Sequence, residues 1–373
     1  MVHPRDFFDA LAENGVHFFS GVPDSLLKNI CSYITDHAAR RDHVIAANEG
    51  NALSIGIGYH LSTGKLPLVY LQNSGLGNIV NPLLSLADPE VLSVPLLMMI
   101  GWRGEPRVKD EPQHSKQGRV TTTMLDAMGV PYKVLSPEDD HEKIVELLSS
   151  LIEKALEENI PCAVLVRKGV FGAYKSEQNC QFIRPLFREQ AVRLIIDKLD
   201  SNDVVVSTTG LTSRELFENR DGHEKDLLVV GGMGHSGQIA LGIALQKPDR
   251  KVYCLDGDGA LLMHAGGLAI TASMGCPNYK HIVFNNSAHD SVGGQPTVCG
   301  SIDLPQLART FGYRWAKSAS SEAEILTSIE EISKVDGPAF LEIQVKIGSR
   351  ADLGRPTIAP VENKHAFMHF LDD

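Results

Sequence analysis

Short β-branched runs alternate with longer segments of helical period along the whole chain, and this alternation constrains the fold more than any other feature. The first half contains VHFFS, HVIAA, KLPLVYLQ, VPLLMMI and CAVLVRK, and the second half contains DVVVS, DLLVV, KVYCLD and YKHIVF. Strands that alternate with helices form βαβ units and a parallel sheet. With 373 residues the chain suits two domains. We therefore predict an α/β protein with two doubly wound parallel-sheet domains, residues 1–178 and 188–373, and the weakly patterned stretch 171–187 as linker.

Composition excludes several classes of protein. The apolar runs are shorter than the roughly 20 residues that a membrane helix needs, and the N-terminus has no apolar signal core, so we expect a cytoplasmic protein. A net charge of −11 argues against a nucleic-acid partner. The six cysteines include no C-x-x-C pair and are expected to be reduced, mostly buried thiols.

Polar residues follow two of the predicted strands. The triplet GDG (257–259) comes directly after KVYCLD, and the pair NN (285–286) follows YKHIVF about 25 residues later, which is room for one helix and one strand. Both motifs are therefore expected at the carboxyl ends of parallel strands, where α/β sheets bind ligands. Asp and Asn offer hard oxygen ligands for a cation, and glycine lets a group such as diphosphate approach the backbone closely.

Three interpretations of these glycines compete. The segment GGMGHSG (231–237) fits G-x-G-x-x-G, and Asp256 ends the next predicted strand about 20 residues later, which is the layout of a dinucleotide-binding site. GDG and NN can also be plain turn residues. A protein that keeps a cofactor fold but only binds partners is a further alternative. The third interpretation of the glycines, a diphosphate and cation site, also accounts for residues in the first half of the chain.

The spacing of GDG and NN resembles the thiamine diphosphate motif of the decarboxylase and acetolactate synthase families. The resemblance implies that Asp258, Asn286 and the backbone carbonyl of Ala288 bind a Mg²⁺ ion that anchors the cofactor's diphosphate. It also implies that the N–H groups of Gly259 and Ala260 bind the diphosphate, and that Met233 wedges the two rings of the cofactor. The other cofactor-binding residues that it implies are Asn73, Thr209, Gly210, Thr212, Gly231 and Gly257.

The family also requires a glutamate in an N-terminal pyrimidine-binding domain. The segment AANEGNALSIGIGYHLSTG (46–64) resembles the family pattern and gives that role to Glu49. There the carboxyl hydrogen-bonds a ring nitrogen of the aminopyrimidine and promotes proton removal from the thiazolium ring. Glu49 and Asp258 belong to different predicted domains, so the resemblance implies a homo-oligomer with active sites at a subunit interface. The chain has no room for the middle domain of larger relatives.

Further segments narrow the resemblance to the family branch that decarboxylates 2-oxo acids with a phosphonate or sulfonate group. They include FSGVPDSLL, LQNSGLGNIVNPL, NNSAHDSVGGQPT and residues 102–118. The expected substrate is a small anionic 2-oxo acid, 3-phosphonopyruvate, which would give phosphonoacetaldehyde and CO2 in phosphonate biosynthesis, with sulfopyruvate as the alternative. The resemblance suggests Asp24 and His114 as catalytic residues and Ser25, Lys116 and His289 as substrate contacts.

The loop 103–119 has the composition of a local anion site in an otherwise acidic protein. Its basic residues outnumber three acids. Two simpler interpretations stay open: the loop can be a solvated basic surface, and Asp24 can be a helix cap. The basic residues are Arg103, Arg107, Lys109, His114, Lys116 and Arg119.

Overall fold

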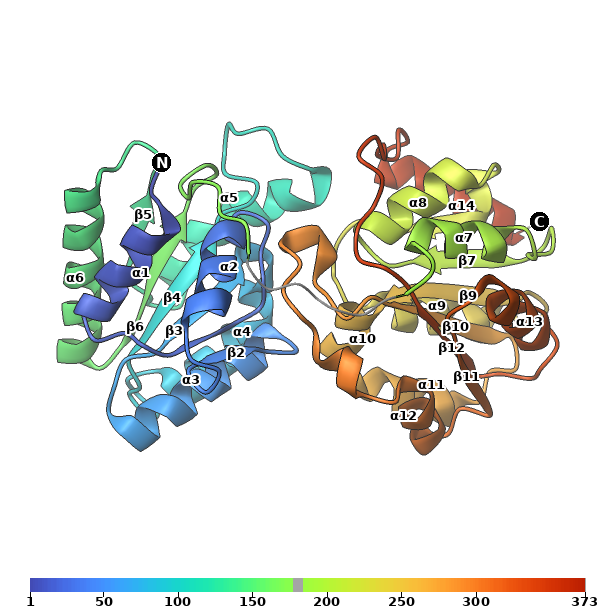
Figure 1. Cartoon of the computed structure of the whole chain (residues 1–373), viewed down its shortest axis with the longest axis horizontal. Coiled ribbons are helices and arrows are strands. Elements are labelled where there is room, and N and C mark those ends of the chain that lie inside the picture. The colour runs from blue at the N-terminus through green and yellow to red at the C-terminus, as the bar shows by residue number, and fades with distance from the viewer. Residues whose placement is uncertain (177–183, 373) are drawn as a thin grey trace. The chain divides into compact units, whose positions relative to one another are not determined.

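The computed structural model describes residues 1–176 and 184–372 and divides into two compact units (Figure 1). The first unit comprises residues 1–179 and 292–295, and the second comprises 180–291 and 296–373. Each unit contains one six-stranded sheet whose neighbouring strands all pair in parallel. The prediction of an α/β protein with two parallel-sheet domains is therefore confirmed, while the domain limits at 178 and 188 stay a prediction.

The sheet of the N-terminal unit has the strand order β2-β1-β3-β4-β6-β5. Its strands are β1 (Phe19–Gly21), β2 (His43–Ile45), β3 (Leu68–Gln72), β4 (Leu96–Gly101), β5 (Tyr132–Leu135) and β6 (Pro161–Val166). Its helices are α1 (Pro4–Glu13), α2 (Lys28–His37), α3 (Glu49–Thr63), α4 (Leu76–Pro82), α5 (Pro112–Ala127) and α6 (His141–Glu158), with short helical turns η1 (Asn73–Gly75) and η2 (Leu83–Ala87).

The sheet of the C-terminal unit has the order β11-β12-β10-β9-β7-β8. Its strands are β7 (Val204–Ser207), β8 (Asp226–Leu228), β9 (Val252–Gly257), β10 (Tyr279–Asn285), β11 (Trp315–Ala319) and β12 (Ala339–Gln344). Its helices are α7 (Arg188–Ile196), α8 (Leu211–Asn219), α9 (Ser236–Gln246), α10 (Asp258–Met263), α11 (Gly266–Met274), α12 (Leu304–Phe311), α13 (Glu322–Ile332) and α14 (Pro360–Asp372). Three short turns are η3 (His223–Lys225), η4 (Asp290–Val292) and η5 (Val298–Ser301).

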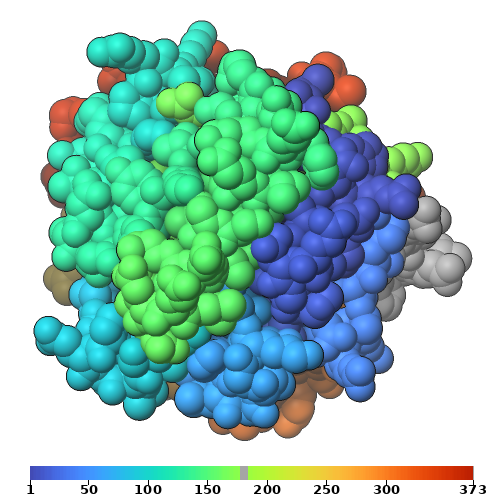
Figure 2. All heavy atoms as spheres, turned by 90° about the vertical axis from the view of Figure 1, so that its left-hand side faces the viewer, coloured from blue at the N-terminus to red at the C-terminus, as the bar shows by residue number. Residues whose placement is uncertain are grey.

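Alternate residues of each central strand face opposite sides of its sheet, so each sheet separates two apolar cores. In β3, Leu68 and Tyr70 pack with α1, α2 and α6, whereas Val69 and Leu71 pack with α3, α4 and α5. Figure 2 shows α1 and α6 side by side on one face of the N-terminal unit. The C-terminal sheet is covered in the same way by α9 to α12 and α14 on one face and by α7, α8 and α13 on the other. This double covering explains why the central strands are almost wholly apolar.

The predicted linker is anchored at both of its described ends. Phe171 is buried in the N-terminal core and pairs with Val2, and the Tyr174 hydroxyl donates to Asp36. At the other end Arg184 is buried against the C-terminal sheet. Residues 177–183 of the predicted linker lie outside the described residues.

Two expectations from composition can be compared with the structure. Within the described residues, none of the helices combines the length and the apolar character that crossing a membrane requires. The cysteines at 31, 162, 254, 276 and 299 are buried and form no disulfide, as predicted. Cys180 lies outside the described residues.

Candidate active site

The C-terminal sheet brings the GDG and NN motifs to one edge. Asp258 is the first residue of α10, directly after β9, and Asn285 is the last residue of the neighbouring strand β10. The predicted placement of both motifs at the carboxyl ends of adjacent parallel strands is therefore correct. The turns after β7 and β8, which complete this run of neighbouring strands, carry Thr209 and Gly231.

Asp258 is a buried carboxylate. Its side chain is 4% exposed, and its Oδ2 accepts a hydrogen bond from the Thr297 hydroxyl at 2.5 Å. Burial raises the pKa of Asp258 to about 6, although the bond from Thr297 opposes this. No salt bridge reaches it within residues 1–176 and 184–372. A buried carboxylate is costly unless positive charge compensates it. The charge of Arg184 favours the ionised form of Asp258, and a divalent cation would add to that effect, so the site fits a hard metal ion.

The two asparagines have different surroundings. The Asn285 amide donates to Glu342 at 2.6 Å, and its oxygen accepts from the N–H and hydroxyl of Ser287. Hydrogen bonds within the protein therefore already engage both ends of the Asn285 amide. The Asn286 oxygen accepts only from the N–H of Ala288 at 3.0 Å among the described bonds, which leaves it one lone pair. Its amide donates to Asp290 at 3.4 Å. These contacts favour Asn286 over Asn285 as the ligand, as the resemblance implies.

Arg184 holds the loop 285–288, and sequence reasoning missed it. Its guanidinium donates to the carbonyl groups of Asn285 and Val345 and, at 3.0 Å, to the Ser287 hydroxyl. Ser287 has φ +58°, a left-handed conformation that is uncommon for serine. Since Arg184 lies in the predicted linker, no periodicity or motif marked it.

The remaining predicted cofactor residues of this unit lie at the same carboxyl edge of the sheet as Asp258. A Cβ placed on Gly259 would lie 3.1 Å from the His289 ring and 3.3 Å from the Met233 methyl group, so these three residues are neighbours. Burial lowers the pKa of His289 to about 4, which keeps its ring neutral. The Thr209 hydroxyl donates to the Val230 carbonyl at 2.8 Å. The other members line the same edge: Gly210 and Thr212 at the start of α8, Gly231 after β8, Gly257 as the cap of α10, and Ala260 and Ala288, both buried.

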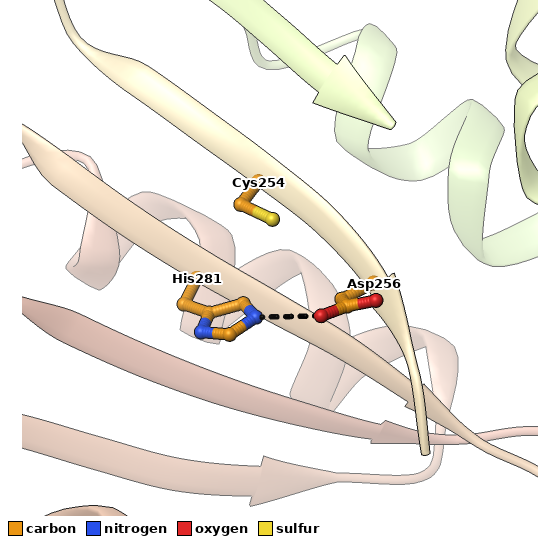
Figure 3. Close-up of side chains that lie close together, drawn as sticks. All are labelled: Cys254, Asp256 and His281. Atoms are coloured by element: carbon orange, nitrogen blue, oxygen red, sulfur yellow. Dashed lines mark hydrogen bonds and ion pairs between the residues drawn. The ribbon is translucent and has the colours of Figure 1, made fainter. Parts of the chain in front are cut away.

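A buried polar network precedes GDG and decides against the dinucleotide interpretation. Figure 3 shows Asp256 and His281 pointing toward one another from β9 and β10, with Cys254 beside them. The His281 ring lies 3.3 Å from one oxygen of Asp256, and the Gly257 N–H donates to the other at 2.9 Å. Asp256 is 2% exposed and is thus not open to a ribose. In addition β7 separates β8 from β9, whereas the dinucleotide fingerprint joins neighbouring strands.

The N-terminal sheet presents Glu49 at its own carboxyl edge. Glu49 begins α3 shortly after β2, is 6% exposed, and accepts a hydrogen bond from Asn78 at 2.7 Å. A Cβ on Gly75 would fall 2.3 Å from its carboxyl, so only glycine leaves room for it. Burial raises the pKa of Glu49, and the Asn78 bond partly opposes this. A carboxyl of this kind can keep a proton and donate it to a ring nitrogen.

Asp24 and Ser25 follow β1 on the same sheet. One oxygen of Asp24 accepts from the N–H groups of Leu26 and Leu27, so the residue does cap the turn before α2. Its other oxygen is buried and has no hydrogen-bond partner in the described part of the chain. Burial raises the pKa of Asp24 to about 6. The Ser25 hydroxyl accepts a bond from Arg103 at 2.6 Å.

The other predicted residues of this unit lie near the end of β4. Asn73 is 1% exposed, and its amide bonds both the carbonyl and the N–H of Arg103. His114 lies in the first turn of α5, where it is partly buried, and Lys116 is exposed on the same helix. The roles that we assigned to these residues stay predictions.

Comparison with known proteins shows to which family the chain belongs. Residues 4–149 match the model of the N-terminal TPP binding domain of thiamine pyrophosphate enzymes, and residues 215–343 match the C-terminal TPP binding domain. Across the whole chain, 33% of residues are identical to phosphonopyruvate decarboxylases of Streptomyces viridochromogenes and of Streptomyces hygroscopicus, with 95% of each relative covered. The chain belongs to the thiamine pyrophosphate enzyme family.

Within this family, sulfopyruvate decarboxylase of Methanosarcina acetivorans is 26% identical over the whole chain and 98% of its own length. Thiamine pyrophosphate is the same compound as thiamine diphosphate. The matches confirm the family resemblance, the two binding domains without a middle domain, and the expectation of a 2-oxo acid decarboxylase. The dinucleotide alternative is wrong.

Proposed function

We propose that this chain decarboxylates 3-phosphonopyruvate to phosphonoacetaldehyde and CO2 with thiamine diphosphate and Mg²⁺. The observation that carries the proposal is the match to two phosphonopyruvate decarboxylases over the full length of this chain. Identity to the sulfopyruvate enzyme over the same span is lower, 26% against 33%. Sulfopyruvate is therefore the second candidate substrate.

The C-terminal edge would hold the metal and the diphosphate. Asp258, Asn286 and the Ala288 carbonyl supply hard oxygen ligands of the kind that Mg²⁺ takes. The N–H groups of Gly259 and Ala260, in the first turn of α10, suit the diphosphate. Bound thiamine diphosphate supplies an electron sink for the electron pair that remains when CO2 leaves.

The residues at the N-terminal edge would carry out the proton transfers of the reaction. Glu49, whose pKa burial raises, would keep a proton for the aminopyrimidine ring. Asp24 has a pKa of about 6, close to neutrality, as an efficient general acid requires. It would replace the departing CO2 with a proton on the carbon that becomes the aldehyde. The net reaction consumes one proton per CO2 released from the carboxylate.

We further propose that the enzyme works as a homo-oligomer. In the family that the chain resembles, the pyrimidine-binding and diphosphate-binding domains of two subunits complete each site. Glu49 and Asp258 belong to those two kinds of domain. Light scattering on the purified protein should therefore give at least twice the mass of one 40.6 kDa chain. A monomer that turns over substrate would overturn this part of the proposal.

The test of the reaction compares CO2 release from phosphonopyruvate, sulfopyruvate, pyruvate and phenylpyruvate, with the cofactor and Mg²⁺ present. We expect the highest kcat/KM for phosphonopyruvate, and loss of activity when EDTA removes the metal. A higher kcat/KM for sulfopyruvate would replace the substrate and leave the cofactor assignment standing. Lack of turnover with any of the four would reject the decarboxylase proposal.

A further inference from the structure

The structure singles out one of the six basic residues between 103 and 119. Arg103 lies two residues after the end of β4, and its side chain is 17% exposed. Of the other five, His114 is partly buried on α5, and the rest are exposed: Arg107, Lys109, Lys116 and Arg119. A cation that binds a substrate inside a site must be both partly desolvated and fixed in place, and Arg103 meets the first condition.

Arg103 is also fixed in place, first through its backbone. The side-chain amide of Asn73 donates to the Arg103 carbonyl at 2.8 Å and accepts from its N–H at 3.1 Å. The same amide donates to the Thr121 hydroxyl on α5. Next along the chain, Gly104 has φ +69°, and a Cβ there would collide with the carbonyl of His114. The loop therefore leaves β4 along a path that only glycine permits.

Asp110 then orients the guanidinium. It accepts bonds from Nε at 2.8 Å and from Nη2 at 2.5 Å, a bidentate pair. The N–H groups of Gly104 and Glu111 also donate to Asp110. Burial opposes ionisation of Asp110, but these four bonds hold its pKa well below the usual range, so the pair stays charged. A desolvated cation is thus balanced before any substrate arrives.

The third side of the guanidinium faces the residues after β1. Nη1 donates to the Ser25 hydroxyl at 2.6 Å, and Ser25 follows Asp24, whose second carboxyl oxygen is buried without a described partner. Gly101, the last residue of β4, leaves room for Asp24, because a Cβ there would lie 2.2 Å from its carboxyl. Asp24, Ser25 and Arg103 therefore form one group at the carboxyl edge, within a single unit of the chain.

We propose that Arg103, together with the Ser25 hydroxyl, binds the anionic phosphonate group of the substrate and so determines specificity. This rests on the proposed function. A guanidinium has five N–H donors, and Asp110 and Ser25 engage three in the described structure, which leaves two for phosphonate oxygens. Asp110 is a positioning residue that fixes the orientation of the Arg103 guanidinium. Pyruvate has no group to meet Arg103, so it gains nothing from this contact.

The test uses the full-length enzyme and the variants Arg103→Met, Arg103→Lys and Asp110→Asn. For Arg103→Met we expect kcat/KM for phosphonopyruvate to fall at least about 100-fold, while the value for pyruvate changes less than threefold. Arg103→Lys keeps the positive charge but lacks the paired donors of a guanidinium, so its kcat/KM for phosphonopyruvate should lie between those of Arg103→Met and wild type. Asp110→Asn should raise KM for phosphonopyruvate about tenfold with little change in kcat. The matched control is Arg107→Met, an exposed arginine of the same loop, which should behave as wild type.

A second readout does not need turnover. Phosphonoacetate carries the same anionic group but has no keto acid to react, and it should inhibit wild type competitively and Arg103→Met at least tenfold more weakly. Equal losses for phosphonopyruvate and pyruvate in both arginine variants would show a purely structural role and overturn the inference. Unchanged kinetics in Arg103→Met would overturn it in favour of another cation. If wild type itself fails on phosphonopyruvate, the proposed function fails instead.

Discussion

The two sheets share one strand order, yet their carboxyl edges present different chemistry. Numbered within its own unit, each sheet has the order 2-1-3-4-6-5, and in each the predicted site residues follow the same four neighbouring strands. The N-terminal edge carries the protonatable carboxyls Asp24 and Glu49. The C-terminal edge carries Asp258 and Asn286, which we propose as ligands of a metal ion. The shared topology fixes where a site can form, and the side chains after each strand decide what it does.

The substitution Glu49→Gln best distinguishes the chemistry of the two edges, and we expect it to have the largest effect on activity. The amide fills the same space beside Gly75 but cannot hold and release a proton, so kcat should fall by about 1,000-fold or more. Because the metal ligands are untouched, calorimetry should show cofactor affinity within tenfold of wild type. Glu90→Gln, an exposed change in the same unit, serves as control. Near-normal activity of Glu49→Gln would break the assignment of proton chemistry to the N-terminal edge.

Asp258→Ala should give the opposite pattern. It deletes a proposed metal ligand, so affinity for thiamine diphosphate in the presence of Mg²⁺ should fall at least about 100-fold, and activity should fall with it. The exposed Asp249→Ala controls for loss of a carboxylate from the same unit. Titration of cofactor with and without Mg²⁺ is the measurement. A variant that still binds cofactor in a Mg²⁺-dependent manner would show that the metal lies elsewhere.

The parts of this comparison that sequence could predict are those with a strong local pattern. KVYCLD and YKHIVF are apolar strands followed at once by polar residues, so the positions of Asp258 and the asparagine pair followed directly. The strands β5 and β11 have several part-exposed or exposed positions, and their weak alternation gives little signal. The choice of Asn286 over Asn285 came from the resemblance, because only contacts such as that of Asn285 with Glu342 distinguish them.

Long-range contacts account for what was missed. Arg184 bonds residues more than 100 positions away, and a weakly patterned segment gives no hint of such partners. In the loop 103–119 the sequence shows six basic residues but not which one is anchored. Which residue is anchored depends on the conformation of the loop, in which the Gly104 N–H donates to Asp110 and Asp110 pairs with Arg103.

Arg184→Met should have a smaller effect on the C-terminal edge. Arg184 donates to the backbone carbonyl of Asn285 and to the side chain of Ser287, on either side of Asn286, and its positive charge favours the ionised form of Asp258. Loss of such a supporting contact typically costs 10–100-fold in metal affinity, and we expect a Mg²⁺ affinity lowered by that amount. Arg220→Met is the matched control, since Arg220 is a buried arginine of the same unit that pairs with Asp226.

The two arginine variants should both lower the melting temperature, because each leaves buried partners unsatisfied. Only Arg184→Met should also weaken Mg²⁺ binding at a temperature where both are folded. Equal Mg²⁺ affinities in the two variants would reduce Arg184 to a purely structural residue.

Asp24→Asn tests the N-terminal edge through stability and has the smallest expected effect. Burial raises the pKa of Asp24 from its ordinary 3.8 to about 6, so the folded protein binds its proton more tightly than the unfolded chain does. Stability from this group is therefore fully present below about pH 4 and is lost as pH rises through 6. The corresponding free energy is at most about 3 kcal/mol. Asparagine carries no charge, so the variant should escape this loss.

Denaturant unfolding at pH 4 and pH 7.5 measures the difference. We expect Asp24→Asn to be about 1–3 kcal/mol more stable than wild type at pH 7.5, with a gain that shrinks toward zero at pH 4, while kcat falls at pH 7.5. Greater stability with lower activity is typical of a residue kept for function at the expense of folding. The control is Asp36→Asn, because Asp36 accepts bonds from Tyr174 and Ser176 and should lose stability at pH 7.5. If the stability difference between Asp24→Asn and wild type does not depend on pH, Asp24 has the same pKa in the folded and unfolded chain. It would then not be a proton donor tuned by burial.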